Sequence, residues 1–244
     1  MDKEFLFGVG ITNANQEDIL KYILYSLKKK DKKYYVVTPN PEILVYANKN
    51  PHFKTILNNA RLALCDGAGL LVAAKILGKS LKTRTTGVDL MESLCKEIAK
   101  KPITVGFLGG RHQVAEKAAE CLRKKYPGLT ITFVAEEWNE DGFVQAQKGQ
   151  GKKEIDLLFV AYGFPKQEEW MSKHLDALPI RVAMGVGGAF DYISGNVSRA
   201  PESIRKIGLE WLFRLIMQPW RIRRQVALPV FIWLVIKEKI ANML

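Results

Sequence analysis

Short apolar segments that end in glycine-containing polar turns recur along this chain, and this pattern limits the folds open to it. The clearest segments cover residues 62–64, 103–108, 155–160 and 181–186. Each has the composition of a short buried strand, and helix-forming sequence follows several of the turns. The repeated order of strand, turn and helix predicts an α/β fold with a Rossmann-like parallel sheet. In such a sheet the polar turns lie together at the carboxyl ends of the strands, where substrates bind.

The length of the chain, 244 residues with 48% apolar residues, suits one large α/β domain or one domain with an appendage. We predict an α/β core over residues 1–195 and a basic, amphipathic helical appendage over residues 196–244. Further strands are expected over residues 5–11, 34–37 and 129–135. Helices are expected over residues 17–30, 42–48, 89–100 and 112–125, the first of them capped by Asn13 or Asn15.

The net charge of +12 indicates an anionic partner, which could be a nucleic acid, an anionic membrane or a phosphate-rich substrate. Half of this charge lies after residue 196, where nine Lys or Arg oppose three Glu. Residues 202–218 spread apolar side chains over a wide helical face, and Pro219 interrupts the pattern before the basic segment 220–224. The apolar run 226–236 contains Pro229 and is too short to span a bilayer.

Two interpretations of this tail remain open. Trp and Arg beside apolar helical surface suit a helix that lies in a membrane interface. An ordinary docking helix with a solvated rim would have the same pattern, and its broad apolar face would also permit a homo-oligomer.

The three cysteines, Cys65, Cys95 and Cys121, are far apart and form neither a disulfide framework nor a zinc spacing. A reducing, cytoplasmic environment is therefore expected. The first residues lack the long apolar core of a signal peptide.

Asp66 follows the apolar segment 62–64 and precedes Gly67 and Gly69. A carboxylate at such a strand end, beside apolar walls, has a raised pKa and suits a general base. The alternative is that Asp66 caps the helix expected from Ala68 or orders the turn.

Several other polar positions are candidate ligands, each with a structural alternative. Thr38 and Asn40 lie in a loop stiffened by two prolines, which could bind a substrate or simply end a strand. Arg84 could bind a phosphate or sugar, or be a solvated surface residue. Gly109 and Gly110 precede a helix in a phosphate-binding arrangement, although the complete GxGxxG pattern is absent. The remaining candidates are Lys166 and Gln167, for a diphosphate and a hydroxyl, and Gly187, for close backbone approach.

Five motifs occur in one order: TPNPE, CDGAG, FLGG, GFPKQEEW, and GVGGAFDYISG with the basic segment that follows it. Together they resemble the WecG/TagA/CpsF family of bacterial glycosyltransferases, which act in the synthesis of wall teichoic acid, enterobacterial common antigen and capsule. The resemblance extends from about Phe5 to Arg224. It implies an inverting transfer of N-acetylmannosamine from UDP to the 4-hydroxyl of N-acetylglucosamine carried on undecaprenyl diphosphate. Donors of the relatives, such as N-acetylmannosaminuronic acid or a hexose, remain possible.

The resemblance also implies roles for the candidate residues. Asp66 would be the base, and Thr38 and Asn40 would line the donor or acceptor pocket. No DxD motif occurs, so protein groups such as Arg84, Gln167 and backbone amides would support the diphosphate without a metal or other cofactor. At the inner face of the cell membrane, the expected ligands of the lipid diphosphate are Arg214, Arg221 and Arg224.

Two other classes of protein fit parts of the pattern. A nucleic-acid-binding module would explain the charge, but the basic residues accompany an apolar tail and not an aromatic stacking surface, so no nucleic acid is expected. A nucleotide-dependent oxidoreductase would need the glycine fingerprint that the chain lacks.

Overall fold

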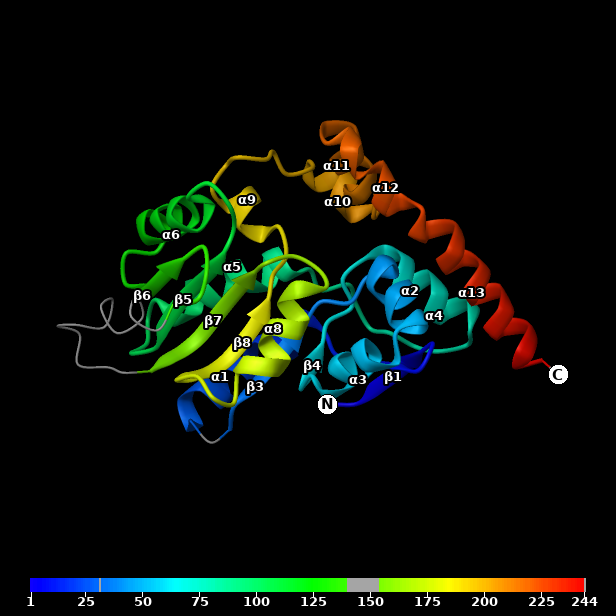
Figure 1. The fold of residues 1–244 in the computed structure, drawn as a ribbon, viewed down its shortest axis with the longest axis horizontal. Helices are drawn as coiled ribbons and strands as arrows, with labels where there is room; N and C mark the ends of the chain where they lie inside the picture. The colour runs from blue at the N-terminus through cyan, green and yellow to red at the C-terminus, as the bar shows by residue number, and fades with distance from the viewer. Residues whose placement is uncertain (31, 140–153, 244) are drawn as a thin grey trace.

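The computed structural model describes residues 1–30, 32–139 and 154–243 (Figure 1). Six strands form a parallel sheet in the order β4-β3-β8-β7-β5-β6, which confirms the predicted α/β fold. They are β3 (Tyr34–Val37), β4 (Leu62–Ala63), β5 (Thr104–Gly109), β6 (Thr130–Ala135), β7 (Ile155–Ala161) and β8 (Ile180–Gly185). Because helices cover both faces, the strands are almost continuously apolar.

Two apolar clusters fill the space on either side of the sheet. On one side lie α1 (Gln16–Lys29), α5 (Gly87–Ile98), α6 (Val114–Lys125) and α9 (Ala189–Ile193). The other cluster contains α2 (Pro41–Lys49), α3 (Pro51–Asn59), α4 (Ala68–Ile76) and α8 (Lys166–His174). The cap of α1 is Asn15, whose Oδ1 accepts the N–H of Asp18 at 2.8 Å, whereas Asn13 accepts the N–H of Lys82.

The single strand predicted over residues 5–11 is wrong. This segment is an antiparallel hairpin of β1 (Lys3–Leu6) and β2 (Val9–Thr12). Phe7 and Gly8 form its two-residue turn, with φ of 53° and 78°, the conformation that matches the twist of the flanking strands. The alternation of apolar residues continues through the turn and hides it in the sequence.

Residues after 200 form the C-terminal appendage, defined here as α10 (Glu202–Lys206), α11 (Glu210–Met217), the 3₁₀ turn η1 (Pro219–Arg221), α12 (Ile222–Gln225) and α13 (Ala227–Ala241). The uninterrupted helical face predicted over residues 202–218 is wrong, because Gly208 adopts φ of +80° between α10 and α11. A Cβ at Gly208 would lie 2.5 Å from the Cβ of Ala68, so this glycine also allows the appendage to contact the start of α4.

Pro229 lies in the first turn of α13, where its missing N–H costs no helical hydrogen bond. From there α13 runs beside α2 and α4, as Figure 1 shows. Within the described ranges, no helix is both long and apolar enough to cross a membrane.

Candidate functional site

The candidate residues follow five neighbouring strands at the carboxyl edge of the sheet. In sheet order, Asp66 follows β4, Thr38 follows β3, Gly187 follows β8, Gln167 follows β7 and Gly109 ends β5. The prediction that the polar turns share one edge is therefore confirmed, and this edge is the usual substrate side of an open parallel sheet.

Asp66 does not cap the helix that follows it. The cap of α4 is Gly67, with φ of 129° and no side-chain hydrogen bond. The backbone N–H of Asp66 donates to the carbonyl of Pro39 at 3.0 Å, and the N–H of Gly87 donates to the Asp66 carboxylate. The carboxylate therefore lies at the N-terminus of α5, a position that favours negative charge.

Burial raises the pKa of Asp66 to about 6, although part of the residue remains accessible to solvent. The Arg84 guanidinium opposes this rise, whereas the nearby carboxylates of Glu210 and Asp89 add to it. A carboxylate with a pKa close to neutrality is suited to accept a proton at physiological pH.

Thr38 and Asn40 border the Asp66 turn. The buried Thr38 hydroxyl donates to the carbonyl of Gly185 at 3.4 Å. Asn40 caps α2 by accepting the N–H of Ile43 at 3.1 Å. The proline-containing loop therefore connects the end of β3 to the start of α2. A Cβ built on Gly67 would lie 3.8 Å from the Cβ of Asn40. The loop therefore forms one wall beside Asp66.

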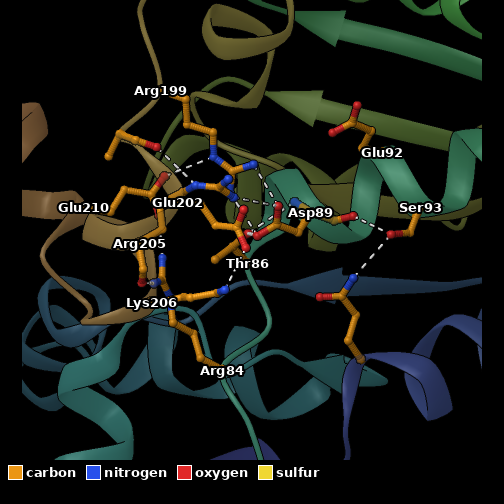
Figure 2. A network of polar contacts seen from close by, with 12 residues as sticks. Arg84, Thr86, Asp89, Glu92, Ser93, Arg199, Glu202, Arg205, Lys206 and Glu210 are labelled. Carbon is orange, nitrogen blue, oxygen red and sulfur yellow. Dashed lines mark hydrogen bonds and ion pairs between the residues drawn. The ribbon is translucent and has the colours of Figure 1, made fainter.

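Arg84 is not a solvated surface residue. Its Nη2 donates to Glu210 Oε2 at 2.5 Å, and its Nη1 donates to the carbonyl of Arg205 at 3.0 Å. Glu210 also accepts from Arg199 Nε at 3.2 Å, and Arg199 donates to both Asp89 oxygens at 2.7 and 2.9 Å. Figure 2 shows this alternating network, which joins the core to the appendage. No local pattern in the sequence indicates that Glu210 and Arg199 join this network.

The three predicted arginines of the appendage come together. Arg214 lies over the Tyr192 ring, 4.8 Å from its centroid, and 3.8 Å from Asp191 Oδ2. Arg224 donates to both oxygens of Glu42, at 2.9 and 2.5 Å. Arg221 forms no ion pair with a carboxylate of the described residues. Burial and the charges of Arg214 and Arg224 lower the pKa of Arg221 to about 10.

Gly188 makes room for Arg214. A Cβ at position 188 would lie 2.5 Å from Arg214 Nη2, while the φ of −87° is ordinary for any residue. Gly188→Ala should therefore leave the fold stable and displace the arginine. We expect the activity of this site to fall to the level of Arg214→Ala, with no further loss in the double variant, because both changes remove the same contact. A loss in the double variant equal to the sum of the two single losses would contradict this role.

Gln167 is buried and holds the turn after β8 in place. Its Oε1 accepts the N–H of Gly187 at 3.0 Å, and its Nε2 donates to Glu168 Oε1 at 2.8 Å. Glu168 is fully buried, and this burial raises its pKa to about 7. Sequence reasoning missed Glu168, although the run Gln167-Glu168-Glu169 at a helix start was a signal. Lys166, the first residue of α8, is exposed.

Gly109 and Gly110 lie farther along the edge, and their described contacts are packing contacts. A Cβ at Gly109 would lie 2.7 Å from the carbonyl carbon of Ala161, and one at Gly110 would lie 3.4 Å from Val114 Cβ. No described contact links these glycines to Asp66. The helix begins at Val114, and not at His112 as predicted, because His112 has a left-handed φ of 59°.

Comparison with known proteins gives consistent matches. The profile of the Glycosyl transferase WecG/TagA/CpsF family matches residues 5–243. Three curated relatives are named N-acetylglucosaminyldiphosphoundecaprenol N-acetyl-beta-D-mannosaminyltransferase. The Bacillus spizizenii protein is 36% identical over 217 residues, which cover 87% of this chain and 82% of the relative. The Bacillus subtilis (strain 168) protein is 28% identical, with coverage of 98% and 93%. The Staphylococcus aureus (strain MRSA252) protein is 30% identical, with coverage of 96% and 92%.

Proposed function

Because the chain belongs to the WecG/TagA/CpsF family of glycosyl transferases, we propose that it transfers N-acetylmannosamine from UDP to N-acetylglucosamine carried on undecaprenyl diphosphate. The new bond is a β-1,4 linkage, made in the synthesis of the wall teichoic acid linkage unit. The observation that carries the proposal is the position of Asp66, whose carboxylate lies at the sheet's substrate edge with a pKa near neutrality.

The reaction is a direct displacement at the anomeric carbon. Asp66 accepts the proton of the acceptor 4-hydroxyl as that oxygen forms its bond to the anomeric carbon. The bond from this carbon to the UDP oxygen breaks, and UDP leaves with the bonding electrons. Arg84 is the cation that acts on the charge of the base and supplies electrostatic support for the leaving diphosphate.

The acceptor diphosphate binds between the three arginines of the appendage. Asp191 and Glu42 accompany Arg214 and Arg224, whereas the partly buried Arg221 has no ion pair with a described carboxylate. A partly buried cation without a counter-ion favours binding of an anion. The fork-shaped guanidinium groups also match phosphate oxygens better than ammonium groups do.

The appendage also binds the inner face of the cell membrane. Large apolar side chains on α11, η1 and α13 are exposed, among them Trp211, Ile216, Trp220, Trp233 and Ile236. Basic side chains on the same segments add attraction to anionic lipids of about 1 kcal/mol each. Tight binding of the purified protein to anionic liposomes, together with weak binding to RNA, would support membrane binding by the appendage. Self-association through the apolar surface would instead appear as an oligomer without lipid.

Transfer is expected not to require a metal. The chain lacks a DxD motif, and the described residues contain no group of three His, Cys, Asp or Glu side chains suited to a metal ion. Treatment with EDTA should leave most of the activity. Complete loss on chelation, followed by recovery with Mg²⁺ or Mn²⁺, would contradict this expectation.

The proposed function is tested by an assay of the purified protein with a panel of UDP-sugars and a lipid-linked N-acetylglucosamine diphosphate acceptor. Transfer from UDP-N-acetylmannosamine supports it. Selective use of UDP-N-acetylmannosaminuronic acid or of a UDP-hexose would keep the family but change the donor. The absence of transfer from every donor would overturn it.

A further inference from the structure

The network in Figure 2 contains Arg84, the cation that acts on the carboxyl of the proposed base, Asp66. It runs from Asp89 through Arg199 and Glu210 to Arg84, whose charge is the largest influence on Asp66 after burial. The signs of the charges alternate along this path. Two of its members, Arg199 and Glu210, come from the C-terminal part of the chain.

Glu210 satisfies Arg84 from the side of the appendage. Both side chains are mostly buried, with 18% and 14% exposure, and their atoms are 2.5 Å apart. Removing the Glu210 charge would leave a poorly solvated guanidinium without an ionic partner, which is costly. Besides Glu210, the carboxylates in this part of the site are Asp89 and Asp66. Asp89 is already paired with both Nη atoms of Arg199. The remaining anion near Arg84 is therefore Asp66 itself.

We propose that Glu210 is a positioning residue that holds Arg84 near Asp66 while preventing the arginine from pairing with the base. This inference rests on the proposed function, in which Asp66 accepts the hydroxyl proton. A direct ion pair would stabilise the carboxylate, lower its basicity and occupy the oxygen that must take the proton. The consequence is that the base is correctly set only while α11 is docked on the core.

The charges around Asp66 indicate that removing the charge of Glu210 would change the pKa of Asp66. The groups that act on the Asp66 carboxyl, or adjoin it, are the N–H of Gly87, the guanidinium of Arg84, the carboxylates of Glu210 and Asp89, and the thiol of Cys65, whose own pKa is raised to about 12 by burial. Glu210 raises the pKa of Asp66 and Arg84 lowers it. Loss of the Glu210 charge therefore lowers the Asp66 pKa both directly and by releasing Arg84.

The test is an NMR titration of the Asp66 carboxyl in the full chain, assigned with Asp66→Asn. In Glu210→Gln we expect the Asp66 pKa to fall by roughly 1 unit or more, and the acid limb of kcat/KM to move to lower pH by the same amount. The matched control is Glu202→Gln, which removes the same charge from an exposed residue paired with Lys206. This control should leave both profiles unchanged.

Undocking of the appendage would also lower the Asp66 pKa by solvating it, so a second variant is needed. Adding Arg84→Gln to Glu210→Gln should raise the pKa again if a new Arg84–Asp66 pair had lowered it. An unchanged pKa in Glu210→Gln, or no recovery in the double variant, would overturn the inference. Failure of the proposed function is separate: it would appear as the absence of transfer from every UDP-sugar by the unaltered protein, and full transfer activity in Asp66→Asn would remove only the base role of Asp66.

Discussion

Replacement of Asp66 by Asn is expected to lower the rate of sugar transfer by roughly 10²–10⁴-fold, while the affinity for UDP changes little. The amide keeps the size of the side chain and can still face the N–H of Gly87. It cannot accept the proton of the acceptor hydroxyl, so the transition state loses the base and the bound donor loses almost nothing. Transfer rates and UDP titrations of the purified variant measure the two effects.

The pH dependence of transfer by the unaltered enzyme independently tests whether Asp66 is the base. The carboxyl must be ionised to act, and its pKa is about 6. Activity should therefore rise through pH 6, level off above pH 7, and fall about tenfold for each unit of pH well below the pKa. The residual activity of Asp66→Asn should lack this limb. Asp176→Asn, on an exposed residue, is the matched control, and near-normal turnover of Asp66→Asn would remove Asp66 from the base role.

Deletion of all residues after Gly195 is expected to abolish transfer, even to a short-chain, water-soluble acceptor. The deletion removes Glu210, the partner of Arg84, and Arg214, which contacts the turn after β8. It also removes Arg221 and Arg224, which we propose as binding groups for the acceptor diphosphate. Release from membranes should accompany the loss, and the soluble acceptor separates the two effects. If the truncated enzyme still acts on that acceptor, the appendage is an anchor and its arginines leave the active site.

Point variants test the same idea in a chain that keeps the appendage. Arg221→Gln should lower kcat/KM for the soluble diphosphate acceptor by roughly tenfold or more, because a charge-assisted hydrogen bond contributes about 1.5–3 kcal/mol. Arg223→Gln is the matched control, since Arg223 is exposed and lies in the same turn. Equal losses in the two variants would indicate a general effect of charge on membrane or acceptor attraction.

The sequence predicted the sheet and its substrate edge because buried parallel strands and glycine turns have local signatures. The runs before Asp66 and Gly187 are short, apolar and bounded by turns, so their positions follow from pattern alone. The hairpin at Phe7 and the break at Gly208 were missed for a common reason. In both places the apolar periodicity continues across a residue with positive φ.

The site was predicted less completely than the fold, because pairings between distant residues leave no local pattern. Arg84 and Glu210 are 126 positions apart, and Arg224 and Glu42 are 182 apart. The prediction that Arg84 contacts phosphate stays a prediction, and only the structure reveals its ion pair with Glu210. Likewise, Gln167 has a clear structural partner in Gly187, which only the neighbouring positions of β7 and β8 could reveal.

The central position of β8 has a consequence for how the protein is made. This strand comes last in the sequence, yet it pairs with β3 on one side and β7 on the other. Until residue 185 has left the ribosome, the strand pair that bears Asp66 and the strands that bear Gln167 are two half-sheets, each with an open apolar edge. Such edges are prone to wrong pairing. Insertion of β8 would close both edges in one event and bring the turns that bear Asp66 and Gln167 to one edge of a complete sheet, late in synthesis.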